Sequence, residues 1–243
     1  MKDEVIWFTE LGKDKDSMGG KAFNLMKMSD MGLPVPEGFV ITQNNLSNGI
    51  DLILKEYKKL LEKYGSVSVR SSANVEDSEK ASFAGIFETT LNVRNKNELL
   101  ISIKKCFDSI REPHVKNYSK RKGIDPGTVK MNVIIQGMIK ANKSGVIFTS
   151  DPSGTRNIII EASDGFGENV VGGKKIPSRY LVDKFTGEIV ESKENSTILN
   201  DNEISELIKY AKILEEKCGR PQDVEWALDE GKIYLLQTRP LTV

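Results

Sequence analysis

The sequence is poor in the two residue types that most often build metal centres and nucleophilic sites. Its 243 residues include two cysteines and one histidine. Cys106 and Cys218 stand far apart without the spacing of a zinc site, so we expect reduced thiols in helical segments. His114 follows Pro113 among basic residues, and we expect it on the surface or in packing. Catalysis by a cysteine or histidine nucleophile is therefore poorly supported.

An excess of charge and a long hydrophobic run are also missing. Thirty-five basic residues balance thirty-five acidic ones, and the strongest basic cluster, residues 116–122, is short. A nucleic-acid-binding protein normally carries a basic excess or stripe, so we expect no nucleic-acid partner. No apolar run approaches the length of a membrane span, and the N-terminus lacks the apolar core of a signal peptide. We therefore expect a cytoplasmic protein with no membrane partner.

Hydrophobic periodicity predicts a mixed α+β protein. Helices are expected where apolar residues recur at helical spacing, at residues 20–31, 51–64, 97–111 and 203–217. Strands are expected at residues 4–8, 39–42, 66–70, 88–93, 130–136, 144–149, 157–162 and 180–183, with a hairpin into residues 188–191. Because strands dominate the second half, we divide the chain into lobes at residues 1–125 and 126–243. A ligand cleft is expected between them.

The C-terminal segment predicts a β-hairpin with two different faces. Alternating runs flank a turn at residues 229–232 that contains Gly231. Side chains alternate along a strand, so one face is apolar and holds Val224, Trp226, Leu228, Tyr234 and Leu236. The other face carries Asp223, Glu225, Gln237 and Arg239. Pairing Glu225 with Gln237 buries both apolar sets together, and it requires a loop of odd length near Gly231.

The polar face of this hairpin allows two interpretations. Carboxylates, an amide oxygen and a guanidinium are suited to Mg²⁺ and to phosphate oxygens. A solvated face with cross-strand ion pairs has the same composition. The hairpin alone leaves both interpretations open.

Three further motifs suit phosphate binding. Lys21 follows Gly19 and Gly20 before a helix, where free backbone N–H groups bind anions, although the pattern is not a Walker A motif. Arg70 ends a strand, and its forked guanidinium suits bidentate contact with phosphate. Residues 79–90 hold small side chains around Gly85, as a loop laid over phosphates requires. A plain helix start, a surface arginine and an ordinary hairpin turn are the simpler explanations.

The motifs occur together in one order along the chain. They are Gly19-Gly-Lys21, Gly32-Leu-Pro-Val-Pro-Glu-Gly-Phe-Val-Ile-Thr42, Val69-Arg-Ser-Ser-Ala-Asn-Val-Glu-Asp77, Ala81-Ser-Phe-Ala-Gly-Ile-Phe-Glu-Thr89, Ser144-Gly-Val-Ile-Phe-Thr149, Pro221-Gln-Asp-Val-Glu-Trp226 and Leu236-Gln-Thr-Arg-Pro240. This set resembles the N-terminal ATP-binding domain of the phosphoenolpyruvate synthase and pyruvate phosphate dikinase family, which includes rifampicin phosphotransferases. The resemblance runs over nearly the whole chain. It implies an ATP-grasp fold, in which two lobes hold Mg-ATP between them.

The resemblance also implies a role for individual residues. Lys21, Arg70 and Arg239 would bind the nucleotide phosphates and carry the catalysis. Further nucleotide contacts would come from Ser82, Gly85 and Thr89 at the phosphates, from Gln136 and Met138 at the adenine, and from Gln237. The metal ligands would be Asp223, Glu225 and Gln237. Catalysis in such a site is mainly charge neutralisation and alignment.

The sequence departs from the family in one respect that bears on function. Family enzymes pass a phosphoryl group from ATP to a histidine on a swivelling domain, and His114 matches nothing in that motif. The chain is also short around residues 43–65 and 191–200. We therefore expect a Mg-ATP-binding, phosphoryl-donating domain that acts on a histidine of a separate domain or subunit. A nucleotide-binding regulatory module without phosphoryl transfer is the alternative, and direct phosphorylation of a small molecule is a third, weaker one.

Overall fold

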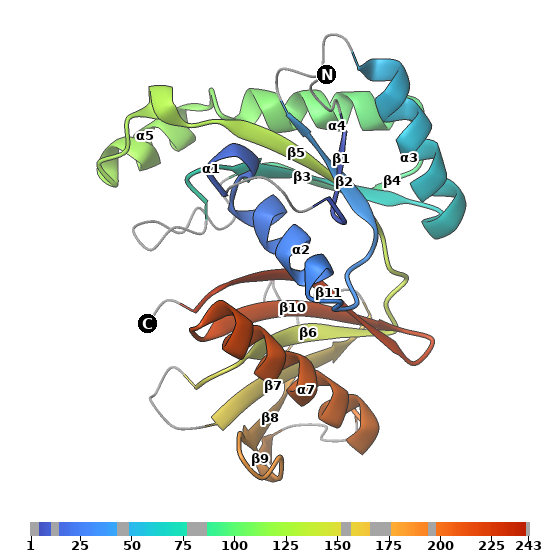
Figure 1. Cartoon of the computed structure of the whole chain (residues 1–243), viewed down its shortest axis with the longest axis vertical. Helices are drawn as coiled ribbons and strands as arrows, with labels where there is room; N and C mark the ends of the chain where they lie inside the picture. Colours follow the sequence, from blue (N-terminus) through green and yellow to red (C-terminus); the bar gives the residue numbers. More distant parts are fainter. Residues whose placement is uncertain are drawn as a thin grey trace. The chain divides into compact units, whose positions relative to one another are not determined.

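The computed structural model describes residues 5–10, 15–42, 49–76, 87–151, 157–165, 176–193 and 198–241. The chain forms two compact units (Figure 1). Unit 1 comprises Met1–Met31 and Pro36–Met138, and unit 2 comprises Gly32–Val35 and Ile139–Val243. Each unit has its own antiparallel sheet, so each is described by itself.

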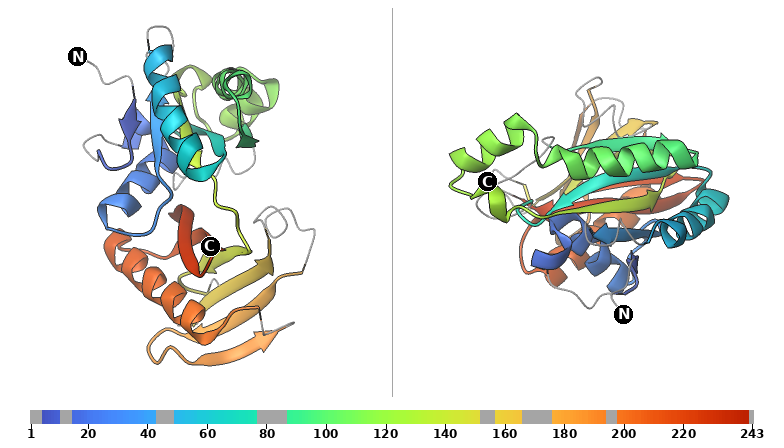
Figure 2. Two further views of the ribbon diagram at one scale, coloured as in Figure 1. Left: turned by 90° about the vertical axis from the view of Figure 1, so that its right-hand side faces the viewer. Right: turned by 90° about the horizontal axis from the view of Figure 1, so that it is seen from above.

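Unit 1 is built on a five-stranded sheet with the order β1-β2-β5-β3-β4. Its strands are β1 (Ile6–Trp7), β2 (Gly38–Thr42), β3 (Val67–Ala73), β4 (Thr89–Val93) and β5 (Met131–Gly137). Its helices are α1 (Lys15–Met18), α2 (Gly20–Asp30), α3 (Ile50–Tyr64), α4 (Lys96–Ser109), α5 (Pro113–Arg121) and the short η2 (Pro126–Thr128). Helices α3 and α4 cover one face of the sheet and α2 lies on the other, as the two views of Figure 2 show.

The core of unit 1 lies between the sheet and helices α3 and α4. Alternate residues of β3 and β5, such as Val69, Val133 and Ile135, belong to one buried cluster with Leu60 of α3 and Ile103 of α4. Because strand residues alternate between faces, the residues between these positions face α2 instead. This alternation decides which polar side chains unit 1 presents beside α2.

Strand β5 is the central strand of the unit 1 sheet, paired with both β2 and β3. Unit 1 therefore extends to Met138, whereas the lobe boundary expected from the sequence lies between residues 125 and 126. The difference has a simple cause. A strand-type run does not show which sheet the strand will join.

Unit 2 is built on a six-stranded sheet with the order β11-β10-β6-β7-β8-β9. Its strands are β6 (Lys143–Phe148), β7 (Asn157–Asp164), β8 (Ser178–Asp183), β9 (Ile189–Lys193), β10 (Gln222–Asp229) and β11 (Lys232–Pro240). Helix α7 (Asp201–Cys218) covers one face and contacts β10, β11 and β6. The helices and strands expected from periodicity are thus present, with bounds that differ by a few residues.

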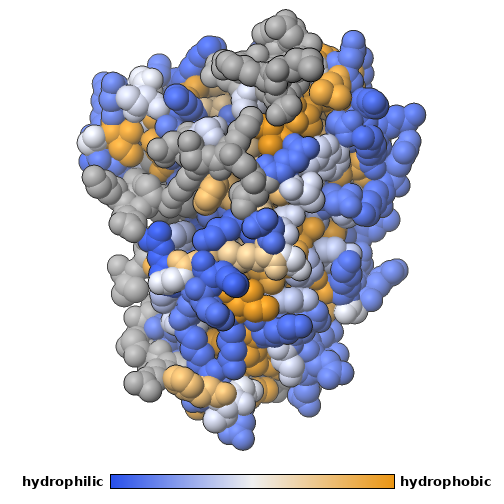
Figure 3. Space-filling model, in the orientation of Figure 1, coloured by the Kyte–Doolittle hydropathy of each residue, from blue (hydrophilic) through white to orange (hydrophobic). Residues whose placement is uncertain are grey.

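Helix α7 has the sequence of an amphipathic helix with both ends capped. The side chain of Asn200 accepts a hydrogen bond from the Glu203 backbone N–H, and Glu203 reciprocates in a capping box. Gly219 ends the helix in the left-handed conformation. The buried stripe of α7 packs on the sheet, and its outward side carries exposed charged residues, which are Lys209, Lys212, Glu216 and Lys217. Hydrophilic residues, blue in Figure 3, cover much of the surface seen in that view.

The sheet face beneath α7 is centred on Trp226, whose side chain is 1% exposed. Gly145 lies directly opposite Trp226 on β6. A Cβ atom at Gly145 would lie 1.8 Å from the carbonyl oxygen of Glu161 and 2.8 Å from the Trp226 ring. The absence of a side chain at position 145 therefore gives the indole its place in the core.

The C-terminal hairpin has the expected polar pairs, but its turn differs from the expected one and a bulge interrupts the pairing. Glu225 pairs with Gln237 and Asp223 with Arg239, while a β-bulge follows between Glu225 and Trp226. The turn itself has two residues, Glu230 and Gly231, with φ of 48° and 80°. The expected loop of odd length is therefore wrong, because a two-residue turn of the I′ type joins the strands and the bulge changes the parity.

The two-residue turn also decides which residues of β11 are buried. Ile233 and Leu235 are 1% and 0% exposed, and Leu235 pairs with Trp226. Tyr234 and Leu236, which the sequence placed on the apolar face, are only half-buried. The polar ends of the two strands keep the expected pairing, because the bulge shifts the register by one residue before they begin.

Among the described residues, none of the helices combines the length and the apolar character that a membrane span requires.

Cys106 lies in the unit 1 core on α4 and its side chain is fully buried. Burial raises the pKa of this thiol to about 12. The reactive thiolate is therefore scarce at pH 8. We expect Ellman's reagent to modify half-buried Cys218 in native protein and to reach Cys106 only in denaturant. A Cys218→Ser variant should then show no fast reaction, and fast modification of Cys106 in the native state would contradict the expectation.

Candidate functional site

Unit 1 gathers several of the predicted residues on the sheet face beside α2. Arg70 on β3 pairs with Thr89 on β4, and directly paired residues point to the same face. Ser68, two residues before Arg70, pairs with Gln136 of β5. Ser72, two residues after Arg70, contacts α2. Arg70, Thr89 and Gln136 therefore share the face on which α2 lies.

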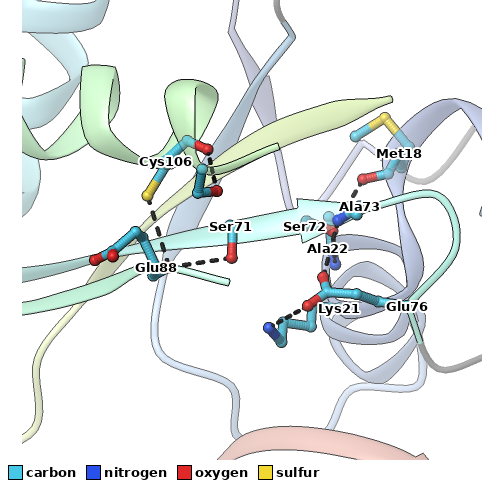
Figure 4. Close-up of polar contacts among 10 residues, drawn as sticks. Met18, Lys21, Ala22, Ser71, Ser72, Ala73, Glu76, Glu88 and Cys106 are labelled. Atoms are coloured by element: carbon cyan, nitrogen blue, oxygen red, sulfur yellow. Dashed lines mark hydrogen bonds and ion pairs between the residues drawn. The ribbon is translucent and has the colours of Figure 1, made fainter. Parts of the chain in front are cut away.

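The N-terminus of α2 is attached to β3 through Ser72. The Ser72 hydroxyl donates to the carbonyl oxygen of Met18 at 3.1 Å and accepts from the backbone N–H of Ala22 at 3.0 Å (Figure 4). The side chain of Asn132 on β5 adds a hydrogen bond to the carbonyl oxygen of Ser17 at 2.9 Å. These contacts hold the first turn of α2 against the sheet.

Lys21 lies in that first turn and is bound to Glu76. Its Nζ is 2.7 Å from Glu76 Oε1, and the two side chains are 13% and 2% exposed. Glu76 follows β3 in a turn and reaches back to α2, as Figure 4 shows. Glu76 stands in the motif at residues 69–77, where no role is predicted for it. Its partner lies 55 residues earlier, and no local pattern signals such a pair.

Gly19 is required where α2 meets β3. Its φ of 81° lies in the left-handed region, which side chains rarely adopt. A Cβ atom at Gly19 would also lie 2.5 Å from Ser72 Oγ and 2.6 Å from the Ser72 carbonyl oxygen. Glycine therefore lets the backbone of the Gly-Gly-Lys motif approach the strand that carries Arg70.

The segment predicted to hold adenine ends strand β5. The side chain of Gln136 is buried and donates from Nε2 to the carbonyl oxygen of Pro36 at 3.4 Å. The Met138 backbone N–H donates to the carbonyl oxygen of Ser66 at 3.0 Å. The thioether of Met138 accepts a hydrogen bond from the Asn92 backbone N–H at 2.9 Å. Both side chains thus have partners within unit 1, and their contact with a base stays a prediction.

Unit 2 presents the four predicted hairpin residues on the sheet face opposite α7. Asp223 and Glu225 alternate with Val224 and Trp226, which are buried on the α7 side. The paired residues Arg239 and Gln237 therefore point away from α7 as well. Glu161 of β7 lies in the same row across the sheet, because Glu225 pairs with Val146 and Val146 with Glu161.

Asp223 and Arg239 form an ion pair across the hairpin. Arg239 Nε donates to Asp223 Oδ2 at 2.8 Å, and Arg239 Nη2 lies 2.7 Å from the same oxygen. The side chains are 34% exposed for Arg239 and 11% for Asp223. The Asp223 carboxylate thus orients the Arg239 guanidinium. The role of Asp223 as a metal ligand stays a prediction.

The donor set of this face fits Mg²⁺ better than a soft metal. Within the ranges that the structure describes, no group of three or more histidine, cysteine, aspartate or glutamate side chains gathers into a metal site. Mg²⁺ takes one or two protein carboxylates and completes its shell with water and substrate phosphates. Glu225 and Gln237 are directly paired, and such Cβ atoms lie about 4.5–5.5 Å apart, close enough for two oxygens to share one ion.

Two predicted residues of the phosphate loop, Ser82 and Gly85, lie outside the described residues. The remaining predicted residues fall into two sets. Unit 1 holds Lys21, Arg70, Thr89, Gln136 and Met138, and unit 2 holds Asp223, Glu225, Gln237 and Arg239. Within each unit, the predicted residues lie on one face of the sheet or next to that face.

Comparison with protein families identifies the chain. Residues 46–198 and 188–243 match the AMP/ATP-binding domain of pyruvate phosphate dikinase. The chain belongs to this family. The resemblance stated from the sequence motifs is therefore confirmed.

Relatives with assigned names are similar over nearly the whole chain. A probable phosphoenolpyruvate synthase of Archaeoglobus fulgidus is 33% identical over 98% of the chain, which spans 41% of that relative. An uncharacterized phosphotransferase of Bacillus subtilis, YvkC, is 33% identical over 98% of the chain and 35% of its own length. A probable phosphoenolpyruvate synthase of Methanocaldococcus jannaschii is 32% identical over 98% of the chain, which spans 26% of that relative. The chain thus spans less than half of these relatives.

Solved structures show the fold. PH1788 of Pyrococcus horikoshii superposes with a TM-score of 0.54 at 16% identity, covering 91% of this chain and 89% of that one. D-alanyl-alanine synthetase A of Vibrio cholerae gives a TM-score of 0.51 at 14% identity, covering 93% of this chain and 55% of that one. The predicted α+β ATP-grasp fold is therefore confirmed.

A substitution at Gly19 tests the close approach of α2 to β3. We expect Gly19→Ala to lower the free energy of unfolding by about 1–3 kcal/mol more than Gly65→Ala, because only Gly19 meets another backbone. Gly65 is a matched control, since its φ is 74° and a Cβ atom there meets nothing within 4 Å. Urea denaturation followed by circular dichroism measures both variants. Equal losses would show that the approach to Ser72 is not tight.

Proposed function

We propose that this chain is the Mg-ATP-binding, phosphoryl-donating domain of a dikinase-type phosphotransferase. The observation that carries the proposal is the register of the C-terminal hairpin. It sets Glu225 against Gln237 and Asp223 against Arg239 on one face, in a chain that belongs to the dikinase AMP/ATP-binding family. The reaction would take place in the cytoplasm, where ATP and Mg²⁺ are supplied.

The proposed roles follow from the chemistry of each side chain. Glu225 and Gln237 would hold Mg²⁺, and Asp223 would add Oδ1, because Arg239 contacts Oδ2. The ion would neutralise phosphate charge when it is bound. The Arg239 guanidinium, oriented by Asp223, suits bidentate contact with phosphate oxygens. Phosphoryl transfer needs little more from a protein than such positioning and charge neutralisation.

Unit 1 carries further cations that suit the phosphates of a nucleotide. Lys21 in the first turn of α2 provides an ammonium beside a helix N-terminus, which itself favours anions. Arg70 shares the sheet face beside α2 with Thr89. We propose that Lys21, Arg70 and Thr89, with Ser82 and Gly85, contact the phosphates, and that Gln136 and Met138 line the adenine. The phosphate acceptor would be a histidine of a separate domain or subunit.

The site assignment is tested by calorimetric titration of the protein with Mg-ATP. We expect Glu225→Ala and Arg239→Ala each to weaken binding by about 10- to 100-fold, because each removes a charged contact of about 1.5–3 kcal/mol. Glu188→Ala is the matched control, since Glu188 is an exposed glutamate of the same unit. Its affinity should equal that of the wild type. Wild-type affinity in both site variants, with folding confirmed, would overturn the assignment.

Phosphoryl donation is tested separately by label transfer. The chain is incubated with Mg²⁺ and ATP labelled at the β or γ position, together with a histidine-bearing domain of a phosphoenolpyruvate synthase. We expect acid-labile label on that domain, and none when Arg239→Ala replaces the wild type. Tight Mg-ATP binding without transfer would favour the regulatory module. Turnover that depends only on an added small molecule would favour direct phosphorylation.

A further inference from the structure

Glu76 is a buried carboxylate to which neither the sequence motifs nor the proposed function assigns a role. It is 1% exposed. One oxygen, Oε1, is bound to Lys21 Nζ at 2.7 Å, and the other, Oε2, accepts the backbone N–H of Ala73 at 2.8 Å. The carboxylate is thus held by its own strand end and directed at a cation on another element.

Burying such an ion pair costs desolvation free energy, so a gain in stability does not explain why the pair is present. Removing a carboxylate and an ammonium from water carries a large desolvation penalty, which their attraction in the interior often does not fully offset. A buried ion pair is therefore weak evidence for a stabilising role. It does restrict geometry, because a bound lysine side chain has already lost the rotamer freedom that a free one keeps.

The attachment of α2 does not depend on this pair. Ser72 binds Met18 and Ala22, and Asn132 binds Ser17. These contacts hold the helix start through neutral groups. What Glu76 adds is the direction of one side chain, that of Lys21. An ammonium carries three N–H donors, so it can bind Glu76 and still donate to phosphate oxygens.

We infer that Glu76 is a positioning residue of the nucleotide site, which holds the Lys21 ammonium in place before the phosphates bind. The inference rests on the proposed function, because it takes Lys21 to be a phosphate contact. Glu76 touches no nucleotide itself and acts only through Lys21. A lysine ordered in advance loses less entropy when ATP arrives, and the affinity for the phosphates rises accordingly.

The variant Glu76→Gln isolates the charge of this side chain. The amide keeps the shape and can still accept from the Ala73 N–H, but it no longer binds the ammonium as a carboxylate does. We expect Mg-ATP binding to weaken by about 10-fold in Glu76→Gln, consistent with the loss of one charge-assisted contact. Adenosine, which lacks phosphates, should bind both proteins equally. Calorimetry with each ligand provides these values, and thermal unfolding shows that the variant is folded.

A double-mutant cycle with Lys21→Met separates positioning from a structural role. If Glu76 acts through Lys21, Glu76→Gln should change Mg-ATP affinity by less than about 2-fold in the Lys21→Met background. The matched control is Glu56→Gln. Glu56 is also buried and bound to a lysine, at 2.6 Å from Lys59, but it lies on α3, which covers the other sheet face. This control should leave Mg-ATP affinity unchanged.

The outcomes distinguish the inference from the proposed function. In one contrary outcome, Glu76→Gln lowers Mg-ATP affinity equally in the wild-type and Lys21→Met backgrounds; in another, it lowers adenosine affinity as much as Mg-ATP affinity. Either result would show that Glu76 supports the fold, and it would overturn the inference alone. If wild-type protein binds no Mg-ATP, the proposed function is overturned and the inference falls with it. A loss for Mg-ATP that requires Lys21, with adenosine unaffected, supports both.

Discussion

The register of the β10–β11 hairpin is the constraint on which the candidate site of unit 2 depends. A two-residue turn at Glu230 and Gly231 sets Leu228 opposite Ile233 and Trp226 opposite Leu235, so these apolar residues face α7 together. The same register, continued without a break, would set Glu225 opposite Leu236. The bulge between Glu225 and Trp226 shifts the register by one residue, and Glu225 then pairs with Gln237 on the face away from α7. The turn thus fixes the core pairs, and the bulge fixes the polar pairs.

The sequence was sufficient to predict the faces of this hairpin but not the way they are achieved. Alternation along β10 shows that Asp223 and Glu225 share a face, because the period of a strand is two residues. It cannot distinguish an odd loop from a tight turn followed by a bulge, since both satisfy the same pairing of Glu225 with Gln237. The choice is made by the local turn geometry, and it decided that Leu235 rather than Leu236 is buried.

Contacts between distant segments were the least predictable part. The motifs identified Lys21 and Arg70, because glycine and arginine near helix and strand ends leave a local pattern. Glu76 stands in the motif at residues 69–77, but the motif does not show its contact with Lys21, which lies 55 residues away in the sequence. The place of β5 was missed for a similar reason. Its apolar run predicts a strand, but only its pairing with β2 and β3 shows to which sheet it belongs.

The two ion pairs described above share one property. Lys21 is paired with Glu76 inside unit 1, and Arg239 is paired with Asp223 inside unit 2. Neither cation relies on the other unit for its counter-charge. The direction of each cationic side chain is therefore set by the fold of its own unit, and each unit can be studied for the order of its cation without reference to the other.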